Sequence, residues 1–350
     1  MKFFKSLSCL CVLLGLLAVL TGCPNRTQEA AEPKGMMYFS YFDTVSYIYS
    51  YAADSQAEFE ARCGAASEVL GEYHRLFDIY YEYSEISNLR TVNLNAGGAP
   101  VKVDRRLIDF LLYAKELYTL TGGEMNIMMG SVLALWHDCR EAASDNPANA
   151  RIPTQAELAE AALHTSIDSL EIDEQNLTVR ITDPDARIDV GALGKGYATE
   201  KAAERLREMG ADSYVLNIGG NIRIIGHKPD GSGWATGIKD PKNPSSFVLQ
   251  LTIADTSCVT SGDYERYFTV NGTKYHHIID KDTLMPSTYF SAVAVFTPNS
   301  GLADALSTAL FTMSYEDGLA LVNRIGNVDV IWITPDGTQH YTQGVADKLA

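Results

Sequence analysis

Residues 188–198 read Ile-Asp-Val-Gly-Ala-Leu-Gly-Lys-Gly-Tyr-Ala, and no other stretch of the chain says as much about its fold. An apolar strand pattern leads into three glycines, and an amphipathic helix pattern over 195–209 follows and ends at Gly210. Glycines at such a junction allow close backbone approach, while Lys195 and the helix N-terminus supply positive charge for a phosphate. The spacings of a Walker A loop and of GxGxxG are both absent, so this segment alone leaves tight packing and anion binding equally open.

Strand and helix patterns extend outward from this junction in both directions. We expect strands at 38–51, 170–172, 177–181, 213–218, 222–226, 247–253, 274–279, 291–297, 328–333 and 338–341. We expect helices at 55–75, 104–120, 155–162, 301–313 and 315–324, with an exposed loop over 140–153. Runs of strands interrupted by a few helices favour an α+β fold, with mixed or antiparallel sheets and flanking helices, over a doubly wound α/β fold.

The N-terminus has the pattern of a bacterial lipoprotein signal. Lys2 and Lys5 precede an apolar run over 7–20 that is short for a membrane span, and Thr-Gly-Cys then ends on Cys23. We expect residues 1–22 to be removed and Cys23 to be acylated, which anchors the chain by lipid such as palmitate to the extracytoplasmic face of the cell membrane. An ordinary cleaved signal is the alternative. Polar residues 23–35 then form a flexible tether, and 36–350 form the folded body.

Charge and cysteine usage exclude several classes of protein. The formal net charge is −16, and removal of a signal that holds Lys2, Lys5 and no acid takes it to −18. So acidic a chain is a poor nucleic-acid binder, and any phosphate-bearing ligand needs a local cation. Three scattered cysteines remain in the body without metal-ligand spacing, so we interpret Cys63, Cys139 and Cys258 as packing residues.

Two further segments hold candidate site residues, each with a structural alternative. Residues 217–221 read Asn-Ile-Gly-Gly-Asn, which predicts a glycine hairpin that is either a simple turn or a ligand contact. His276 and His277 are adjacent on a predicted strand and therefore point to opposite faces, so at most one of them joins a given site. Asp280 orients His277 only if the strand ends in a turn there.

Asp304 and Thr308 are four residues apart in a predicted helix, which places a carboxylate and a hydroxyl on one face. Hard oxygen ligands of this kind suit Mg²⁺, which also takes substrate phosphate oxygens as ligands. The structural alternative is a threonine hydroxyl bonded to the carbonyl four residues earlier.

Taken together and in this order, these segments resemble the ApbE family of FAD:protein FMN transferases, from about Tyr38 to the C-terminus. The matching segments are Phe42-Asp43-Thr44, 83–89, 188–198, 217–221, 260–267, 277–280 and 304–310. The resemblance implies an ApbE-like α+β fold with a core related to the T-fold. It also implies a catalytic body at 36–350 that attaches FMN to other proteins.

The resemblance further implies roles for individual residues. The Ala192 carbonyl, Asp304 and Thr308 would bind Mg²⁺ against the FAD pyrophosphate, and His277 with Asp280 would be catalytic, His277 as the general base. Tyr80 would contact the flavin. The residues implied in FAD binding are Phe42, Tyr80, Glu124, Met125, Asn126, Asp189 and Lys195.

The chain departs from the family pattern at three places. Many relatives read Gly-Gly-x-Phe-Asp where this chain has Gly-Gly-Glu-Met-Asn, so Asn126 replaces an acid. Lys281 stands where proline is common, and Gly301 stands where some relatives carry another acidic metal ligand, which favours one metal over two.

The acceptors implied by the resemblance are proteins with a Thr/Ser flavinylation motif in membrane electron-transfer systems. An FAD pyrophosphatase that releases FMN and AMP, and a non-catalytic FAD-binding lipoprotein, are the alternative functions. A base and a metal helix favour an enzyme over a binder, while the sequence leaves transferase and hydrolase open.

Overall fold

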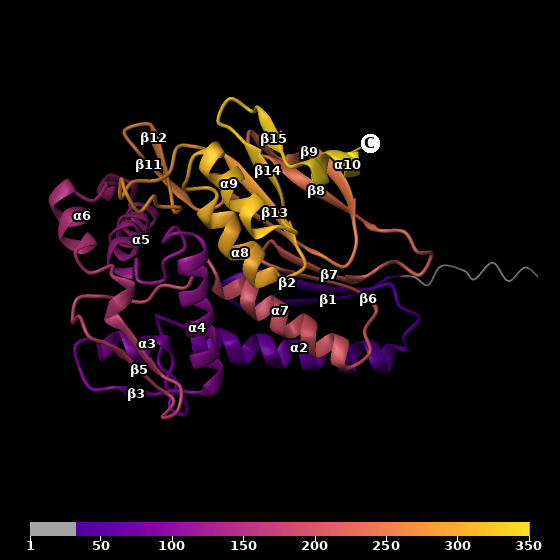
Figure 1. The fold of residues 1–350 in the computed structure, drawn as a ribbon, viewed down its shortest axis with the longest axis horizontal. Coiled ribbons are helices and arrows are strands. Elements are labelled where there is room, and N and C mark those ends of the chain that lie inside the picture. Colours follow the sequence, from indigo (N-terminus) through magenta and orange to yellow (C-terminus); the bar gives the residue numbers. More distant parts are fainter. Residues whose placement is uncertain (1–32, 350) are drawn as a thin grey trace, which may run out of the picture. The chain divides into compact units, whose positions relative to one another are not determined.

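An eight-stranded antiparallel sheet forms the centre of the structure, a computed structural model that describes residues 33–349 (Figure 1). In spatial order its strands are β1 (Lys34–Tyr41), β2 (Thr44–Ser50), β6 (Ser213–Ile218), β7 (Asn221–Gly226), β10 (Ser257–Gly262), β13 (Ala292–Thr297), β14 (Asp329–Ile333) and β15 (Gln339–Tyr341). Side chains alternate between its two faces, so each face needs its own cover. The α+β fold expected from the sequence is confirmed.

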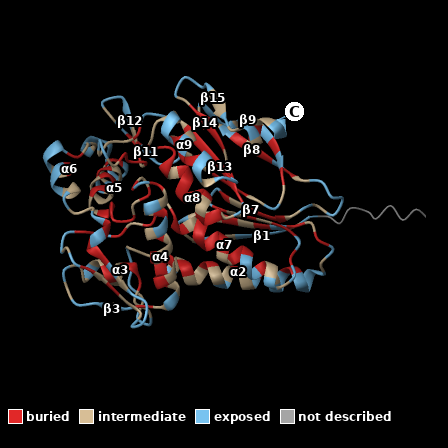
Figure 2. Ribbon diagram, viewed as in Figure 1, coloured by how far each residue is buried: buried red, intermediate tan, exposed pale blue. Residues whose placement is uncertain are grey.

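Helices cover one face of this sheet (Figure 1). They are α2 (Gln56–Phe77), α4 (Arg105–Leu120), α7 (Gly194–Glu208), α8 (Ser300–Ala309) and α9 (Tyr315–Ile325). Ile48 and Leu216 join a core with α2, α4 and α7, while Val295 and Trp332 join a second core with α8 and α9. Most residues of α7 and α8 are buried, so both helices lie in the interior (Figure 2).

The opposite face is covered over only part of its width. The hairpin of β8 (Trp234–Asp240) and β9 (Asn243–Ile253), with α10 (Gln343–Leu349), supplies this cover. Its buried side chains, such as Trp234 and Leu251, pack on Phe296 and Ile331 of β13 and β14. The hairpin therefore protects the half of the sheet that lies far from β1.

A smaller region lies beside the sheet and contributes to the site. It contains α3 (Leu89–Leu94), α5 (Gly130–Asp145), α6 (Gln155–Ala162), two 3₁₀ turns (Pro147–Asn149 and Ile167–Ser169), the sheet β3 (Val101–Lys102)–β5 (Thr178–Ile181)–β4 (Leu170–Asp173), and the hairpin β11 (Tyr267–Val270)–β12 (Thr273–His276). Trp136 of α5 stacks near Tyr275, and its indole N–H donates to the Leu284 carbonyl at 2.9 Å. This packing holds α5 against the segment that contains the two histidines.

A close backbone approach joins α7 to α8. A Cβ atom on Gly196 would lie 2.4 Å from the Asp304 Cβ and 2.4 Å from the Ser300 carbonyl oxygen. Only glycine therefore fits at this position. The close packing alternative for the glycine-rich junction is thus realised at Gly196.

Most predicted elements are present, and four expectations need correction. The single strand expected at 38–51 is two strands, because Phe42 and Asp43 adopt positive φ angles of 53° and 50° and form a turn. Residues 140–145, expected in a loop, continue α5. The segment before the glycines is not a strand; Ile188 is instead held by two hydrogen bonds with the Asn93 side chain. Lys34, expected in the tether, already begins β1.

The three body cysteines are buried and free, as expected. The signal at 1–22 and the lipidation site Cys23 lie outside the described residues. Among the residues described, no helix has both the length and the apolar character to cross a membrane.

We expect Gly196→Ala to lower the free energy of unfolding by about 1–3 kcal/mol, because the new methyl group overlaps α8. The matched control is Gly64→Ala in α2, where a Cβ meets no atom within 4 Å. This control should raise stability by about 0.5–1 kcal/mol, since alanine is the better helix former. Urea unfolding of both variants checks the pair, and equal effects would contradict the close contact.

Candidate active site

The N-terminal end of α7 meets the β6–β7 turn, β10 and α8. Asp304 of α8 is buried, and its Oδ2 accepts a hydrogen bond from the Gly196 N–H at 2.8 Å. Burial raises the pKa of this carboxyl, while the Lys195 charge, the Gly196 N–H and an Asn221 hydrogen bond oppose the rise. Asp304 is therefore a buried acid that a cation would hold in its charged form.

A backbone carbonyl just before α7 is also open. The N-cap of α7 is Leu193, so Ala192 lies outside the helix and the Gly196 N–H is one of the first N–H groups that have no acceptor within it. Here that N–H donates to Asp304, while the next N–H, from Tyr197, bonds to the Leu193 carbonyl at 3.0 Å. The Ala192 carbonyl thus accepts no backbone hydrogen bond among the described residues and remains open to a ligand.

Thr308 follows Asp304 by one helical turn, as the spacing predicts. Its hydroxyl lies 3.5 Å from the Ser261 hydroxyl of β10, which lies 2.8 Å from that of Ser307. Among the described contacts, the Thr308 hydroxyl does not donate to the Asp304 carbonyl. The Ser307 hydroxyl donates to that carbonyl instead, at 2.9 Å. The structural alternative for Thr308 is therefore not what the fold uses.

Asn221 adds a further oxygen to this group. It follows the predicted glycine turn, in which Gly219 and Gly220 have φ angles of 57° and 92°, and it is buried. Its Oδ1 is buried without a hydrogen-bond partner in the described part of the chain. A buried polar atom without a partner is costly, so a carboxylate, a freed carbonyl, a hydroxyl and this amide oxygen together fit a hard cation such as Mg²⁺.

A buried ion pair fixes the position of α8. Glu200 of α7 lies 3.1 Å from the Arg223 guanidinium, and both side chains are buried. The same carboxylate accepts the Ser300 N–H at 2.6 Å, at the first residue of α8, where a negative charge suits the helix dipole. Glu200 therefore sets α8, and with it Asp304, against α7.

His277 presents one free ring nitrogen. Its backbone N–H and its Nδ1 both lie near the Arg266 carbonyl, at 3.1 Å and 3.2 Å. A carbonyl only accepts, so Nδ1 carries the hydrogen and Nε2 keeps its lone pair. Burial first, and then the charges of Arg266, His276, Lys195 and Arg140, lower the pKa of His277 to about 3. The ring is therefore neutral at neutral pH, and its Nε2 keeps a lone pair.

Its neighbour His276 is the last residue of β12 and has a structural role. The strand ends there, before His277, and not at 279. The His276 Nε2 lies 2.8 Å from the Ser287 carbonyl, and its Nδ1 accepts the Ile278 N–H at 3.2 Å. Both ring nitrogens are thus used within the fold. Of the two adjacent histidines, only His277 is available to a site.

Asp280 does not contact the imidazole that it was expected to orient. Its Oδ1 accepts the N–H groups of Asp282 and Thr283 at 2.8 Å and 3.0 Å, so the carboxylate holds the turn that follows His277. In the described structure the Arg266 carbonyl orients the ring instead. Asp280 thus acts on His277 only through the backbone.

Several cations and an aromatic pair surround this histidine. Arg140 of α5 lies 2.8 Å from the His137 Nδ1, and the His137 ring packs at 5.5 Å from that of Tyr80. The Asp189 Oδ1 accepts the Gly191 N–H at 2.8 Å. Burial raises the pKa of Asp189, and the charges of His137, Arg266 and Lys195 oppose this rise. An acidic protein thus concentrates positive charge at one place, as a phosphate ligand requires.

Sequence reasoning missed His137, Arg140, Arg266 and Asn221 as site residues. Arg266 and Asn221 lie in quoted motifs, but their types gave no specific signal. His137 and Arg140 are three residues apart and therefore share one helix face. This spacing could have indicated a shared site, but the sequence analysis did not predict the helix that contains both residues.

The segment 124–126 is tied to the fold in three different ways. Glu124 lies 3.1 Å from the Thr312 hydroxyl and 3.3 Å from Lys281, and Met125 is buried in the core. The Asn126 amide donates to the Thr165 carbonyl at 2.9 Å and accepts the Met128 N–H at 2.9 Å. The lysine that departs from the family pattern therefore pairs with Glu124.

Phe42, the remaining predicted residue, lies in the β1–β2 turn. Its N–H donates to the His74 Nδ1 at 3.2 Å, and its ring meets the His74 ring edge-on at 5.5 Å. The neighbouring Asp43 is close enough for its charge to raise the pKa of Tyr80, behind the larger effect of burial. The turn therefore borders the aromatic side of the site.

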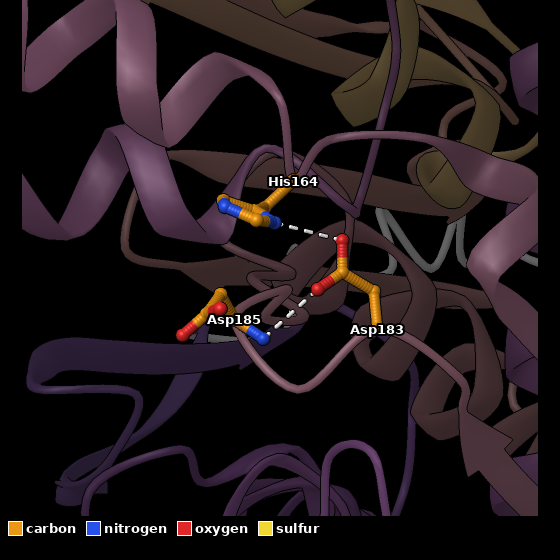
Figure 3. Close-up of side chains that lie close together, drawn as sticks. All are labelled: His164, Asp183 and Asp185. Atoms are coloured by element: carbon orange, nitrogen blue, oxygen red, sulfur yellow. Dashed lines mark hydrogen bonds and ion pairs between the residues drawn. The ribbon is translucent and has the colours of Figure 1, made fainter.

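A second group with metal-ligand chemistry consists of His164, Asp183 and Asp185 (Figure 3). The His164 Nδ1 lies 2.8 Å from the Asp183 Oδ2, and the Asp183 Oδ1 accepts the Asp185 N–H at 2.9 Å. The hydrogen bond with Asp183 raises the pKa of His164. Contacts within the group explain its arrangement, so we assign no metal there.

Comparisons of sequence and structure find known proteins to which this chain is similar. The sequence model of the ApbE family matches residues 43–332. The FAD:protein FMN transferase of Treponema pallidum is 33% identical over 97% of this chain and 94% of its own, and that of Vibrio cholerae is 29% identical over 94% and 95%. Among solved structures, the ApbE protein of Thermotoga maritima has a TM-score of 0.80 at 26% identity, over 91% of this chain and 100% of its own.

We expect the pKa of His277 to lie well below 6.5 and to rise when inorganic pyrophosphate binds, because the anion offsets the surrounding cations. Histidine NMR titration with and without pyrophosphate measures this change. His276 is the internal control, since its two ring contacts lie within the fold, and its pKa should not move. A His277 pKa near 6.5 that ignores the anion would contradict the described site.

The lowered pKa of His277 also predicts a pH dependence of stability. Because the folded pKa of about 3 lies below the unfolded value of 6.5, protons bind the unfolded chain first as pH falls. The stability contributed by the neutral ring is therefore complete above pH 6.5 and is lost between pH 6.5 and 3. Urea unfolding at several pH values measures this. Between pH 6.5 and 3, the free energy of unfolding should fall more steeply for the native chain than for His277→Gln.

We expect Asn126→Asp to lower the free energy of unfolding by about 1–3 kcal/mol. The substitution removes the only donor to the Thr165 carbonyl that this side chain offers and places an acceptor opposite it. Restoring the family acid should therefore weaken the fold. Urea unfolding checks this, and unchanged or increased stability would show that the Thr165 contact does not hold the amide.

Proposed function

Because the chain belongs to the ApbE family and is an FAD:protein FMN transferase, we propose that it transfers FMN from FAD to a threonine or serine hydroxyl of an acceptor flavoprotein, with Mg²⁺ as cofactor and AMP as product. The observation that carries this proposal is the hydrogen bond from Gly196 to Asp304. It joins a buried acid to the proposed phosphate-binding end of α7, where the Ala192 carbonyl is also open. A storage protein needs neither feature.

Positive side chains account for binding of the FAD pyrophosphate. Lys195 lies in the N-terminal turn of α7. The charges of Lys195, Arg266 and Arg140 all lower the pKa of His277. Asp189 and the 124–126 segment contribute polar and backbone groups, while Tyr80, more than half exposed and paired with His137, offers its ring to the flavin.

Asp304, the Ala192 carbonyl and Thr308 would hold the cation, with Asn221 as a further oxygen near them. When bound, Mg²⁺ offsets charge on the pyrophosphate and stabilises AMP as a leaving group. A position for a second acidic ligand is taken by Gly301, so we propose a single metal.

His277 acts as the general base. Its Nε2 takes the proton of the acceptor hydroxyl while that oxygen forms a bond to the FMN phosphorus, and the phosphorus–oxygen bond to AMP breaks. The Arg266 carbonyl holds the opposite ring nitrogen and so keeps the required tautomer. The flavin ring takes no part in the bond changes and is carried as cargo.

We further propose that the chain is a lipoprotein anchored through acylated Cys23 to the extracytoplasmic face of the cell membrane. The support is the lipobox at the N-terminus, which lies outside the described residues. An anchored enzyme reaches acceptors that are embedded in the same surface. The acceptors that fit are subunits of membrane electron-transfer systems.

We expect the purified chain, supplied with FAD and Mg²⁺, to attach FMN to an acceptor domain that bears an exposed threonine motif. The mass of the acceptor should rise by that of the attached FMN group. His277→Ala should slow the transfer by roughly 10²–10⁴-fold, since it removes the base. Asp304→Asn and Thr308→Val keep the side-chain shape but remove a ligand charge or a ligand oxygen, so both should slow the transfer. A metal chelator should slow the transfer of the native chain in the same way. Intact mass and in-gel flavin fluorescence measure the adduct.

The control for these variants is Asp183→Asn, which alters the other acidic group and should leave transfer unchanged. Mg²⁺ should also raise the melting temperature of the native chain but not that of Asp304→Asn. AMP release without an adduct on any acceptor would favour the pyrophosphatase. No FAD turnover would favour a binding protein.

A further inference from the structure

Three exposed side chains and one half-buried tyrosine form an apolar and aromatic patch on the first hairpin. We call Met37, Phe39, Tyr47 and Tyr49 the aromatic strip. Met37 pairs across the strands with Tyr47, and Tyr49 pairs with Gly35, so these residues share one face of the sheet. The Tyr47 and Tyr49 rings stack at 5.9 Å with an interplanar angle of 7°.

Exposure in the strip is large for side chains of this kind. Phe39 is 70% exposed, Met37 47% and Tyr49 38%. A register shift between Tyr38 and Tyr41 marks an irregularity of β1 that includes Phe39 and Ser40, and irregularities of this kind change the direction of side chains. The neighbouring inward residues of β2 are buried, so the strip contributes nothing to that core.

Within the described residues, the outer part of this half of the sheet has no cover. The β8–β9 hairpin packs on β7, β10, β13 and β14 and reaches Val215 of β6 and Tyr51 after β2, but the residues of the aromatic strip are not in that cluster. β1 is also an edge strand, and exposed apolar edges are normally blunted by charge or covered. A contiguous exposed patch of this kind indicates an interaction surface.

We propose that the aromatic strip rests in the headgroup region of the phospholipid bilayer to which the chain is anchored. This inference rests on the proposed lipid anchor. Ten residues separate Cys23 from Lys34, the first residue of β1, and so span at most roughly 40 Å. A body of this length has a diameter of about 50 Å by radius-of-gyration scaling, so the tether keeps the start of β1 near the membrane.

The chemistry of the strip fits that environment. Tyrosine and phenylalanine are favoured at the bilayer interface, where an apolar ring lies below a polar rim. Lys34 begins the same strand, and Lys228 lies over the Tyr51 ring at 6.0 Å, at the end where the tether arrives. The acidic body gains little from general charge attraction, so apolar contact has to orient it.

This orientation has a consequence for the reaction. The hairpin that carries the strip runs from the tether to the Phe42–Asp43 turn, which packs on His74 in the last turn of α2, shortly before Tyr80 in the chain. Contact along the hairpin would hold the site at a fixed height beside the bilayer. Acceptor hydroxyls close to the membrane surface would then be reached without extension of the tether.

The test couples the mature chain, starting at Cys23, to a maleimide phospholipid, which replaces biological acylation. Cys63, Cys139 and Cys258 are buried, so coupling is confined to Cys23. Phe39→Trp and Leu163→Trp are compared in vesicles of phosphatidylcholine brominated near the headgroup. The matched control is exact in exposure, because Phe39 and Leu163 are both 70% exposed.

We expect brominated lipid to reduce the added emission of Phe39→Trp by about twofold and to leave that of Leu163→Trp unchanged. Trp136, Trp234 and Trp332 are buried and contribute a constant background. Without coupling, Cys23→Ser should bind vesicles weakly, and adding Met37→Ser, Phe39→Ser and Tyr49→Ser should reduce that binding roughly tenfold. Circular dichroism verifies that the exposed substitutions leave the fold intact.

Absence of quenching at Phe39→Trp in the coupled chain, or equal quenching at both positions, would overturn the proposal. A blue shift at Phe39→Trp that depends on protein concentration and not on bromine would overturn it in favour of strand pairing with a second protein. Mass spectrometry of the chain from native membranes tests acylation of Cys23 separately. Failure of the anchor and failure of the strip are therefore distinguishable.

Discussion

The contact between Gly196 and α8 is the constraint on which the site depends. No side chain fits between the two helices at this point, so the backbone of α7 comes within hydrogen-bonding distance of Asp304. That bond satisfies an N–H of the first turn of α7 that has no acceptor within the helix, and the Ala192 carbonyl just before the helix accepts no backbone hydrogen bond among the described residues. Close packing of the two helices thus also places Asp304 at the start of α7.

Electrostatics then divides the molecule into an acidic body and a cationic site. Burial and the surrounding cations keep His277 neutral, while burial without a metal works against ionisation of Asp304. The Glu200–Arg223 pair is buried beneath the site and holds the N-terminus of α8. Breaking one partner of such a pair leaves a buried charge, so this pair gives the metal helix a defined position.

Local periodicity predicted most helices and strands because each carries an apolar face towards a core. It failed where a short signal competes with a long pattern. The Phe42–Asp43 turn interrupts an otherwise continuous strand pattern without a glycine, and α5 extends into a segment rich in turn-forming residues. The second error concealed His137 and Arg140, which the sequence placed at the edge of a loop. Residue type alone likewise gave no reason to choose Asn221.

The sequence by itself determined the α+β fold, the lipobox and the placement of Asp304 and Thr308 on one helix face. These follow from local patterns, which span a few residues at a time. The tertiary structure alone decided that Asp280 does not orient His277, that the Arg266 carbonyl does, and that Asp304 bonds to Gly196. The last joins residues 108 positions apart, and only folding brings such partners together.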